Sequence, residues 1–380
     1  MLLREEHQKI SLLRGVRRAA ARILRAAPLH VAPLALWRTL LPKTAVGVCY
    51  HMVSQGPVRH LKHYRFLDPK TFESDLDYLS ARFEFVTYEE LARRRAANIL
   101  ERRNPLILTF DDGFAECATV VAPLLRRRAL RCVFFVITDL IDNQELFRES
   151  AASLCIDAVA RLPFEQVRSI MAESGLEQSV RPGPSNSLSE PTTTLPFGLA
   201  ELDCHPDPRL VPLVRWLLEV RPSEAALVER MLARLGIDSR EYLEKARPYL
   251  TSEQLRQLHA DGFTIGAHSR SHRRLQELPR TDAEREIIES CRIVRDITGQ
   301  ASVPFAFPYF GGGLDRSWLA GLRERHDFIG LFFDTDGVRE DEPFVVQRVF
   351  GERFSRDRTL DAILRRAWAD PAGWRRRPIR

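Results

Sequence analysis

Leu106-Ile-Leu-Thr-Phe-Asp-Asp-Gly113 is the stretch that decides the fold, and it has a counterpart in Phe263-Thr-Ile-Gly-Ala-His-Ser-Arg-Ser-His272. Each stretch is an apolar run that ends abruptly in polar side chains. Apolar runs without alternation are typical of strands buried on both faces, as in a parallel sheet covered by helices. The two stretches therefore predict an α/β fold with functional groups at strand ends.

The same pattern recurs between residues 46 and 349, where short apolar runs alternate with stretches of helical periodicity. Seven such units favour a (β/α) barrel over an open sheet, and in barrels the functional residues follow the strand C-termini. The expected strands are Val46–Tyr50, Leu106–Phe110, Cys132–Ile137, Phe263–Ala267, Val303–Pro308, Ile329–Phe333 and Val345–Val349. The expected helices are Lys70–Leu79, Tyr88–Ile99, Thr119–Arg127, Ser252–Ala260, Thr281–Thr298 and Trp318–Arg325.

One segment interrupts the alternation, because residues 151–250 contain no convincing strand. Its helical patterns flank a stretch rich in Pro, Ser and Thr, Pro182–Gly198, which predicts a loop. We interpret the segment as a helical insertion between two barrel units, of the kind that shapes a substrate site or forms a lid. The predicted organisation has five parts: 1–44, a basic N-terminal segment; 45–150 and 251–355, the two parts of the barrel; 151–250, the insertion; and 356–380, a basic tail.

Residues 9–27 combine leucines and isoleucines at helical spacing with arginines on the opposite face. This amphipathic helix either packs on the main domain or lies on an anionic bilayer. The first residues do not resemble a signal peptide, and no apolar run is long enough to span a membrane. We therefore expect a cytoplasmic protein, with the inner face of the membrane as a further contact.

The composition, 44% apolar and 28% charged, is typical of a soluble globular protein. The net charge of +6 is not accompanied by an aromatic and basic stacking motif, so no nucleic-acid partner is expected. None of the six cysteines forms a CxxC pair, which indicates buried thiols in a reducing compartment. Cys49 and Cys117 are near the candidate site in sequence and are expected to be inert.

The polar strand ends suggest a metal site. Asp111 and Asp112 could converge where the chain turns at Gly113, although a helix N-cap beside a solvated acid is the alternative. His268 and His272 are four residues apart, which would place both imidazoles on one face of a helical turn. Two imidazoles and one carboxylate favour zinc, cobalt, nickel or iron. The remaining carboxylate could accept a proton from water acidified by that metal.

With these residues in view, the chain resembles the polysaccharide deacetylase family (carbohydrate esterase family 4, the NodB homology domain). Thr109–Gly113 is similar to the first family motif, His268–His272 to the second, and Pro308-Tyr309 with Gly311 to the third. The resemblance covers most of residues 45–355 outside the insertion. It implies a distorted (β/α)7 barrel and a divalent metal, usually zinc.

The resemblance also implies residue roles. Asp111 would be the general base, and Asp112, His268 and His272 would be the metal ligands. Pro308 and Tyr309 would line the acetyl pocket, with the backbone N–H of Tyr309 donating to the oxyanion, and Phe114 would contact substrate.

Two departures from the family pattern leave questions open. Ala306 stands where family members carry an arginine that orients the base, and Arg348 is a hypothetical replacement. No late histidine is present to protonate the leaving group, so the proton donor is either His51 or a protonated Asp111. His51 could equally be a structural strand-end histidine. Asp334 and Asp336 either orient groups in the site or cap a turn.

The expected function is removal of an N-acetyl group from an amino sugar in a glycan or in a nucleotide-linked or lipid-linked precursor. One alternative keeps the metal site but changes the bond, giving a deformylase or an amidase acting on a non-sugar amide or imide. Another alternative is a catalytically degraded module that binds glycan without turnover. The sequence does not indicate an oligomeric state.

Overall fold

The computed structural model describes residues 45–63, 66–97, 105–176, 179–180, 208–339, 341–352 and 359–369. The amphipathic helix expected over residues 9–27 and the loop expected over Pro182–Gly198 lie outside the described residues. None of the described helices is long and apolar enough to cross a membrane.

The centre of the molecule is a closed barrel of seven parallel strands. Strand β1 pairs with β3 on one side and with β8 on the other, which closes the order β1-β3-β4-β5-β6-β7-β8 into a ring. The strands are β1 (Val46–Tyr50), β3 (Pro105–Phe110), β4 (Val133–Val136), β5 (Thr264–Ala267), β6 (Val303–Ala306), β7 (Ile329–Asp334) and β8 (Val345–Phe350). The predicted distorted (β/α)7 barrel is therefore confirmed.

The distortion is visible at β3. Its first two residues pair with the short strand β2 (Glu84–Phe85), which the sequence pattern missed, and its last two residues pair with β4. A register shift between Val303 and Phe305 interrupts the ladder of β6 and β7 as well. The barrel is therefore irregular along its circumference.

Alternate strand residues divide between two apolar layers, as the pleat of a strand requires. Ile107, Phe135, Phe333 and Val346 belong to one cluster, which is joined by Tyr88 and Leu91 of helix α4. Residues of the other parity, such as Leu108 and Phe110, pack toward the surrounding helices. These helices are α3 (Pro69–Ser80), α4 (Tyr88–Ala96), η2 with α5 (Cys117–Val121, Ala122–Arg127), α12 (Ser252–Ala260), α13 (Arg280–Thr298) and α14 (Arg316–Arg325), with the short turns η3 (Thr138–Asn143) and η7 (Leu275–Glu277).

Within the predicted tail 356–380, the structure has a helix, α15 (Leu360–Ala369). Leu360, Leu364 and Trp368 of this helix are buried in the barrel-side core, and the Trp368 ring packs on Phe83 at 5.9 Å. This part of the chain is thus a component of the barrel wall and not only a basic tail.

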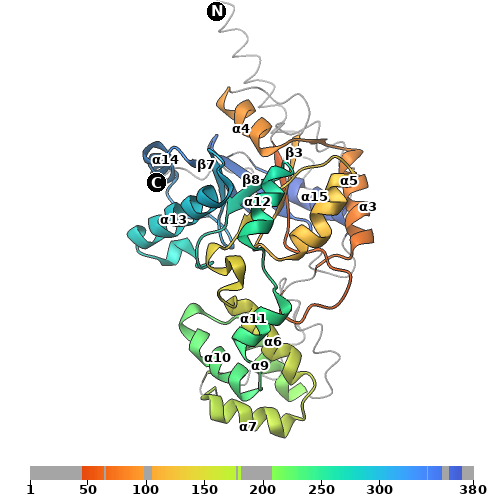
Figure 1. Ribbon diagram of the computed structural model, residues 1–380, viewed down its shortest axis with the longest axis vertical. Coiled ribbons are helices and arrows are strands. Elements are labelled where there is room, and N and C mark those ends of the chain that lie inside the picture. The colour runs from red at the N-terminus through yellow and green to blue at the C-terminus, as the bar shows by residue number, and fades with distance from the viewer. Residues whose placement is uncertain are drawn as a thin grey trace, which may run out of the picture.

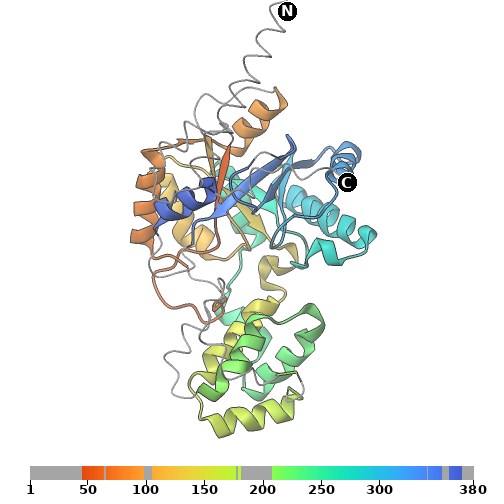
Figure 2. The ribbon, with the colours of Figure 1, turned by 180° about the vertical axis from the view of Figure 1, so that it is seen from behind.

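A helical lobe lies below the barrel in Figure 1 and is seen from behind in Figure 2. It consists of α6 (Arg148–Val159), α7 (Phe164–Ser174), η5 with α9 (Pro208–Leu210, Val211–Leu218), η6 with α10 (Pro222–Glu224, Ala225–Arg234) and α11 (Ser239–Ala246). The first four helices share an apolar core of their own, which includes Leu154, Val167, Leu217 and Met231. We call residues 148–246 the insertion lobe.

The insertion lobe is attached to the barrel through a separate apolar cluster that contains Phe114, Phe147, Leu243 and Tyr249. Polar contacts reinforce the attachment. Buried Asp157 of α6 accepts a hydrogen bond from Arg59 at 2.8 Å. The loop after β1 therefore binds the lobe as well as its own barrel.

Candidate active site

The candidate residues gather at the C-terminal ends of the barrel strands, as the barrel topology requires. Asp111 directly follows β3, and His268 directly follows β5. His51 follows β1, while Arg348 lies within β8. Segments more than two hundred residues apart in sequence therefore contribute to one site.

The Asp111–Asp112 pair converges because the chain turns sharply after β3. Asp112 and Gly113 both adopt left-handed backbone conformations, with φ of 70° and 76°. A left-handed Asp is tolerated but uncommon. On a continuing strand the side chains of Asp111 and Asp112 would point to opposite faces of the sheet. The turn instead lets both carboxylates face the same site.

The expectation of a helical turn for His268 and His272 is wrong. The segment is a loop in which Ser269 and His272 have φ of 60° and 54°, and the Ser269 hydroxyl accepts a hydrogen bond from the backbone N–H of His272 at 2.9 Å. Glu286 of α13 holds this loop from outside, because its carboxylate accepts from the N–H groups of Arg270 and Ser271. The two imidazoles still meet, with ring centroids 4.9 Å apart.

Asp112, His268 and His272 form a buried cluster that fits a metal ion. Their ligand atoms all lie within 4.8 Å of one another, and the Nε2 atoms of both histidines are 3.6 Å from Asp112 Oδ1. Two donors bound to one tetrahedral ion at the usual zinc distances lie about 3.4 Å apart. His268 Nδ1 is 2.9 Å from the carbonyl oxygen of Ala306, a contact that assigns the proton to Nδ1 and leaves Nε2 as a ligand. The geometry and chemistry of these donors therefore fit the divalent ion.

Arg348 holds the other carboxylate. Its Nη1 and Nη2 atoms donate to the two oxygens of Asp111 at 2.7 and 2.9 Å, and both side chains are buried. Gly47 on the neighbouring strand makes room, since a Cβ there would lie 2.4 Å from Cγ of Arg348. Burial alone would raise the pKa of Asp111, but Arg348, with His268 and His51, lowers it to about 2. Asp111 is therefore ionised at neutral pH.

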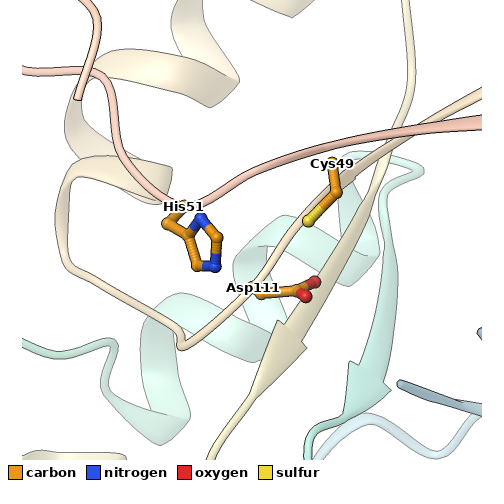
Figure 3. Close-up of side chains that lie close together, drawn as sticks. All are labelled: Cys49, His51 and Asp111. Atoms are coloured by element: carbon orange, nitrogen blue, oxygen red, sulfur yellow. The ribbon is translucent and has the colours of Figure 1, made fainter. Parts of the chain in front are cut away.

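His51 and Cys49 complete the surroundings of Asp111, and Figure 3 shows all three side chains directed toward a common space. His51 Nδ1 lies 3.2 Å from the buried carboxylate of Glu352, just past β8. Burial alone would lower the pKa of His51, but Glu352 outweighs it and the pKa rises to about 9. His51 is therefore a cation at neutral pH.

Cys49, His51 and Asp111 also lie close enough together to hold a metal ion. However, the Arg348 guanidinium already lies 2.7 Å from Asp111 and 3.6 Å from the Cys49 sulfur. Burial raises the pKa of the Cys49 thiol well above its usual range, with Arg348 acting against this shift. A fixed cation and a protonated thiol disfavour a second ion here.

The loop after β6 carries Tyr309, which has a φ of 61°. Buried Asp334 fixes this loop by accepting from Gly311 N at 2.7 Å and from Arg316 at 3.0 Å, and Thr335 donates to the Tyr309 carbonyl at 2.6 Å. Asp334 thus orients the Tyr309 loop and does not reach the metal cluster. Four of the eight described non-glycine residues with positive φ belong to this site, namely Asp112, Ser269, His272 and Tyr309. Such clustering of strained backbone is typical of functional sites.

Two predicted substrate contacts have other surroundings. Phe114 is fully buried and packs between His60 and Tyr249 at 5.8 and 6.0 Å, in the cluster that attaches the insertion lobe. Pro308 is buried, and the next residue, Tyr309, is half-buried. Neither residue lines the cavity described next. For Phe114, the turn at Asp112 and Gly113 directs the chain after it into the core.

A cavity of about 760 Å³ opens over the cluster and separates the barrel end from the insertion lobe. Asp111, Asp112, His51 and Tyr309 line its barrel side. The opposite side is formed by the lobe, through Arg148 and Glu149 of α6 and the segment 218–223 between α9 and α10. The predicted general base and metal ligands therefore share one cavity with the insertion.

Comparisons with known proteins agree with this geometry. The family model for polysaccharide deacetylases matches residues 101–175 and 228–323. The chain belongs to the polysaccharide deacetylase family. Members of this family are metal-dependent hydrolases of carbon–nitrogen bonds, so the protein is an enzyme of this class. No curated protein matches the chain.

Several solved structures resemble this deacetylase. PplD, a deacetylase from Streptococcus pyogenes in complex with acetate, has a TM-score of 0.50 at 13% identity, covering 85% of this chain and 98% of that one. IcaB from Ammonifex degensii gives a TM-score of 0.47 at 17% identity, covering 87% and 97% of the respective chains. A de-N-acetylase from Aggregatibacter actinomycetemcomitans gives 0.44 at 13% identity, covering 80% and 94%. The likeness to PplD shows the same fold.

Sequence reasoning missed three acids that support this deacetylase site: Glu149, Glu286 and Glu352. Each lies outside the family motifs. Glu149 and Glu286 contact motif residues, and Glu352 contacts His51, only because the fold brings them together. Glu352 carried one usable signal, its place at the end of a predicted strand. Glu149 and Glu286 lie on helices and carried none.

Proposed function

We propose that this deacetylase removes the N-acetyl group from an amino sugar in a glycan or glycan precursor, using a divalent metal, most simply zinc. The observation that carries the proposal is the ionised carboxylate of Asp111 beside the Asp112, His268 and His272 cluster, all within one cavity. A hydrolase needs a group that accepts the proton of the attacking water, next to a group that activates the carbonyl. The two neighbouring carboxylates divide these tasks.

Asp112, His268 and His272 would hold the ion, and two imidazole donors favour zinc over magnesium or calcium. A divalent ion in this position polarises the amide carbonyl and makes water more acidic. The backbone N–H of Tyr309 is a second group that could polarise the carbonyl, as a hydrogen-bond donor. No group among the described residues accepts a hydrogen bond from it. Donors of this type stabilise the oxyanion that forms on the carbonyl oxygen.

Asp111 accepts the proton of the water. Arg348 keeps the Asp111 carboxylate ionised and fixes its plane through two hydrogen bonds. One lone pair of each carboxylate oxygen therefore remains directed away from the guanidinium. In other family members, an arginine at the position of Ala306 would orient this carboxylate. Arg348 reaches the same carboxylate from β8.

His51 donates the proton that the leaving nitrogen needs. Its imidazolium is stabilised by Glu352 through Nδ1, and its ring lines the cavity. A donor that is protonated at neutral pH fits the final step, in which the carbon–nitrogen bond breaks. The alternative donor is Asp111 itself, which would return to the leaving nitrogen the proton it has taken from the water.

Charged side chains on the cavity wall support a phosphate-linked precursor as substrate. The residues are the arginines Arg148, Arg221, Arg273 and Arg274 and the acids Glu149, Glu219 and Glu277. Glu277 and Glu149 partly neutralise their arginine neighbours at 3.8 and 3.5 Å. Arg221 and Arg273 have no ion-pair partner within the described residues. Exposed arginines of this kind bind phosphate oxygens, as found in nucleotide-linked and lipid-linked sugars.

We also propose a cytoplasmic location, with residues 9–27 in contact with the inner face of the membrane. The five described cysteines are free and buried, as is typical of a reducing compartment. Deletion of residues 1–27 should release the protein from membranes and leave its activity on a soluble substrate intact. Unchanged fractionation after the deletion would remove the membrane contact from the proposal.

The test of the proposed activity is acetate release from N-acetylated amino sugars, offered free, nucleotide-linked and polyprenyl-phosphate-linked, to zinc-loaded protein. We expect release from at least one of them, its loss on chelation, and its loss in the Asp111→Asn variant. Zinc-loaded wild type that releases no acetate contradicts the proposal. Formate release from N-formyl sugars instead would identify a deformylase, and binding of a sugar without any release would identify a binding module.

A further inference from the structure

The start of the insertion lobe, together with Phe147 just before it, reaches the metal cluster directly. Phe147 packs its ring edge-on against the His272 imidazole, with centroids 5.1 Å apart. Glu149, in the first turn of α6, accepts a hydrogen bond from the Tyr309 hydroxyl at 2.6 Å. The same Glu149 oxygen lies 3.9 Å from His272 Nδ1. The lobe therefore contacts both the second histidine of the cluster and the loop of the oxyanion donor.

The two histidines differ in how their outer nitrogens are satisfied. His268 Nδ1 is 2.9 Å from the Ala306 carbonyl oxygen. His272 Nδ1 is buried and has no hydrogen-bond partner within the described residues. A histidine that binds a metal nearly always donates its other N–H to a carboxylate or carbonyl, which fixes the ring and its tautomer.

Glu149 is the acceptor best placed to complete this pattern. An approach of about 1 Å would bring its carboxylate into hydrogen-bond distance of His272 Nδ1. An ionised carboxylate has lone pairs for this bond in addition to the one from Tyr309. Arg148, which donates to the Tyr309 hydroxyl at 3.1 Å, lies 3.5 Å from Glu149 on the same side of the cavity.

We propose that Glu149 is the positioning carboxylate of the metal centre, orienting His272 as a ligand and holding the Tyr309 loop. The inference rests on the metal site of the proposed function. It gives the insertion lobe a second task besides forming the cavity wall, because the lobe completes the support of a barrel ligand. The ligand from β5 and the donor from the loop after β6 are then coupled through one side chain of α6.

The test compares Glu149→Gln with Glu165→Gln, a matched control on α7 whose carboxylate is 65% exposed and pairs with arginines of the same lobe. Zinc affinity is measured by competition with a chromogenic chelator, and the d–d absorption of cobalt-loaded protein is recorded. For Glu149→Gln we expect zinc binding weaker by about tenfold to a hundredfold and an altered cobalt spectrum, with both unchanged in the control. Glu149→Asp should restore part of the affinity.

Zinc affinity within twofold of wild type in Glu149→Gln, with an unchanged cobalt spectrum, would overturn the inference. Melting temperatures of the metal-free proteins show whether each variant is folded. If Glu149→Gln does not fold, the pair Glu149→Ala and Glu165→Ala carries the same comparison, and equal affinities again overturn it. The Asp112→Ala variant separates this failure from failure of the proposed function. Zinc binding that survives Asp112→Ala contradicts the site itself, whatever Glu149 does.

Discussion

Asp111 and Asp112 are neighbours in the chain but have contrasting surroundings. Asp111 is 2.7 Å from the Arg348 guanidinium, a cation at every accessible pH. Asp112 is 3.6 Å from two imidazole nitrogens. Burial, followed by His268 and Arg148, lowers the pKa of His272 well below its usual range, so this imidazole is neutral.

A buried carboxylate is costly unless a cation compensates it. The protein supplies that cation to Asp111 through Arg348, and this carboxylate is therefore held and ionised before any substrate arrives. On the Asp112 side the protein supplies a neutral imidazole and a second ring whose Nε2 is directed inward. A divalent ion bound by Asp112, His268 and His272 would add positive charge on that side. The difference teaches how two adjacent acids can be suited to different tasks: Arg348 holds Asp111, and under the proposed function a metal would hold Asp112.

The largest expected effect comes from breaking the Asp112 side. In Asp112→Ala, we expect metal binding to be lost and acetate release to fall by a factor of about 10⁴ or more, about 5 kcal/mol in the barrier. Metal content by mass spectrometry and the rate of acetate release measure both. Added zinc should restore chelated wild type but not the variant. Full activity of chelated wild type would contradict the division of tasks.

The next effect comes from breaking the Asp111 side. Arg348→Ala leaves a buried carboxylate without its cation, and we expect the free energy of unfolding to fall by about 3–5 kcal/mol. Urea denaturation of metal-free protein measures it. The control is the double variant Asp111→Asn with Arg348→Ala, which removes both charges and should recover a large part of the loss. A double variant no more stable than Arg348→Ala would mean that Arg348 acts through packing.

The sequence could predict the barrel and the residues at its strand ends, because apolar runs and the polar residues that follow them are local signals. All seven barrel strands lie where those runs predicted them. The metal cluster follows from the same logic, since parallel strands bring their C-terminal ends together. The conformations of the loops that follow the strands could not be predicted from the sequence. The non-helical path of His268–His272 depends on Glu286, a residue of a distant helix.

Arg348 was predictable from the sequence only in part. Its place on a strand was predictable, and its role as a replacement cation was a hypothesis. Its contact with Asp111 requires that β8 pair with β1 and that β1 pair with β3, and a glycine at position 47 must leave the space. Glu149 had no such strand position. Its contact with the site depends on the packing of an entire lobe, and no local pattern encodes that packing.

A smaller expected effect is the pH dependence of the stability that His51, next to Asp111, contributes. The pKa of His51 is raised to about 9 in the folded protein from an ordinary value near 6.5. Its interaction with Glu352 therefore stabilises the fold fully below pH 6.5 and is lost as pH rises through about 9. The quantity compared is the free energy of unfolding of wild type minus that of His51→Gln. We expect this difference to be about 3 kcal/mol larger at pH 6 than at pH 10. Urea denaturation of metal-free protein across this range measures the difference. A difference independent of pH would mean that His51 is neutral when folded.

The smallest effect concerns Cys49, which tests whether the Asp111 side binds metal at all. In Cys49→Ala we expect zinc affinity and stoichiometry to be unchanged, because the Arg348 guanidinium contacts both the thiol and Asp111 and disfavours a second cation there. The loss of a buried sulfur should cost about 1 kcal/mol of stability. Isothermal titration with zinc and urea denaturation measure the two quantities. A lower zinc stoichiometry in Cys49→Ala would show that both acids recruit metal, and the contrast between Asp111 and Asp112 would no longer hold.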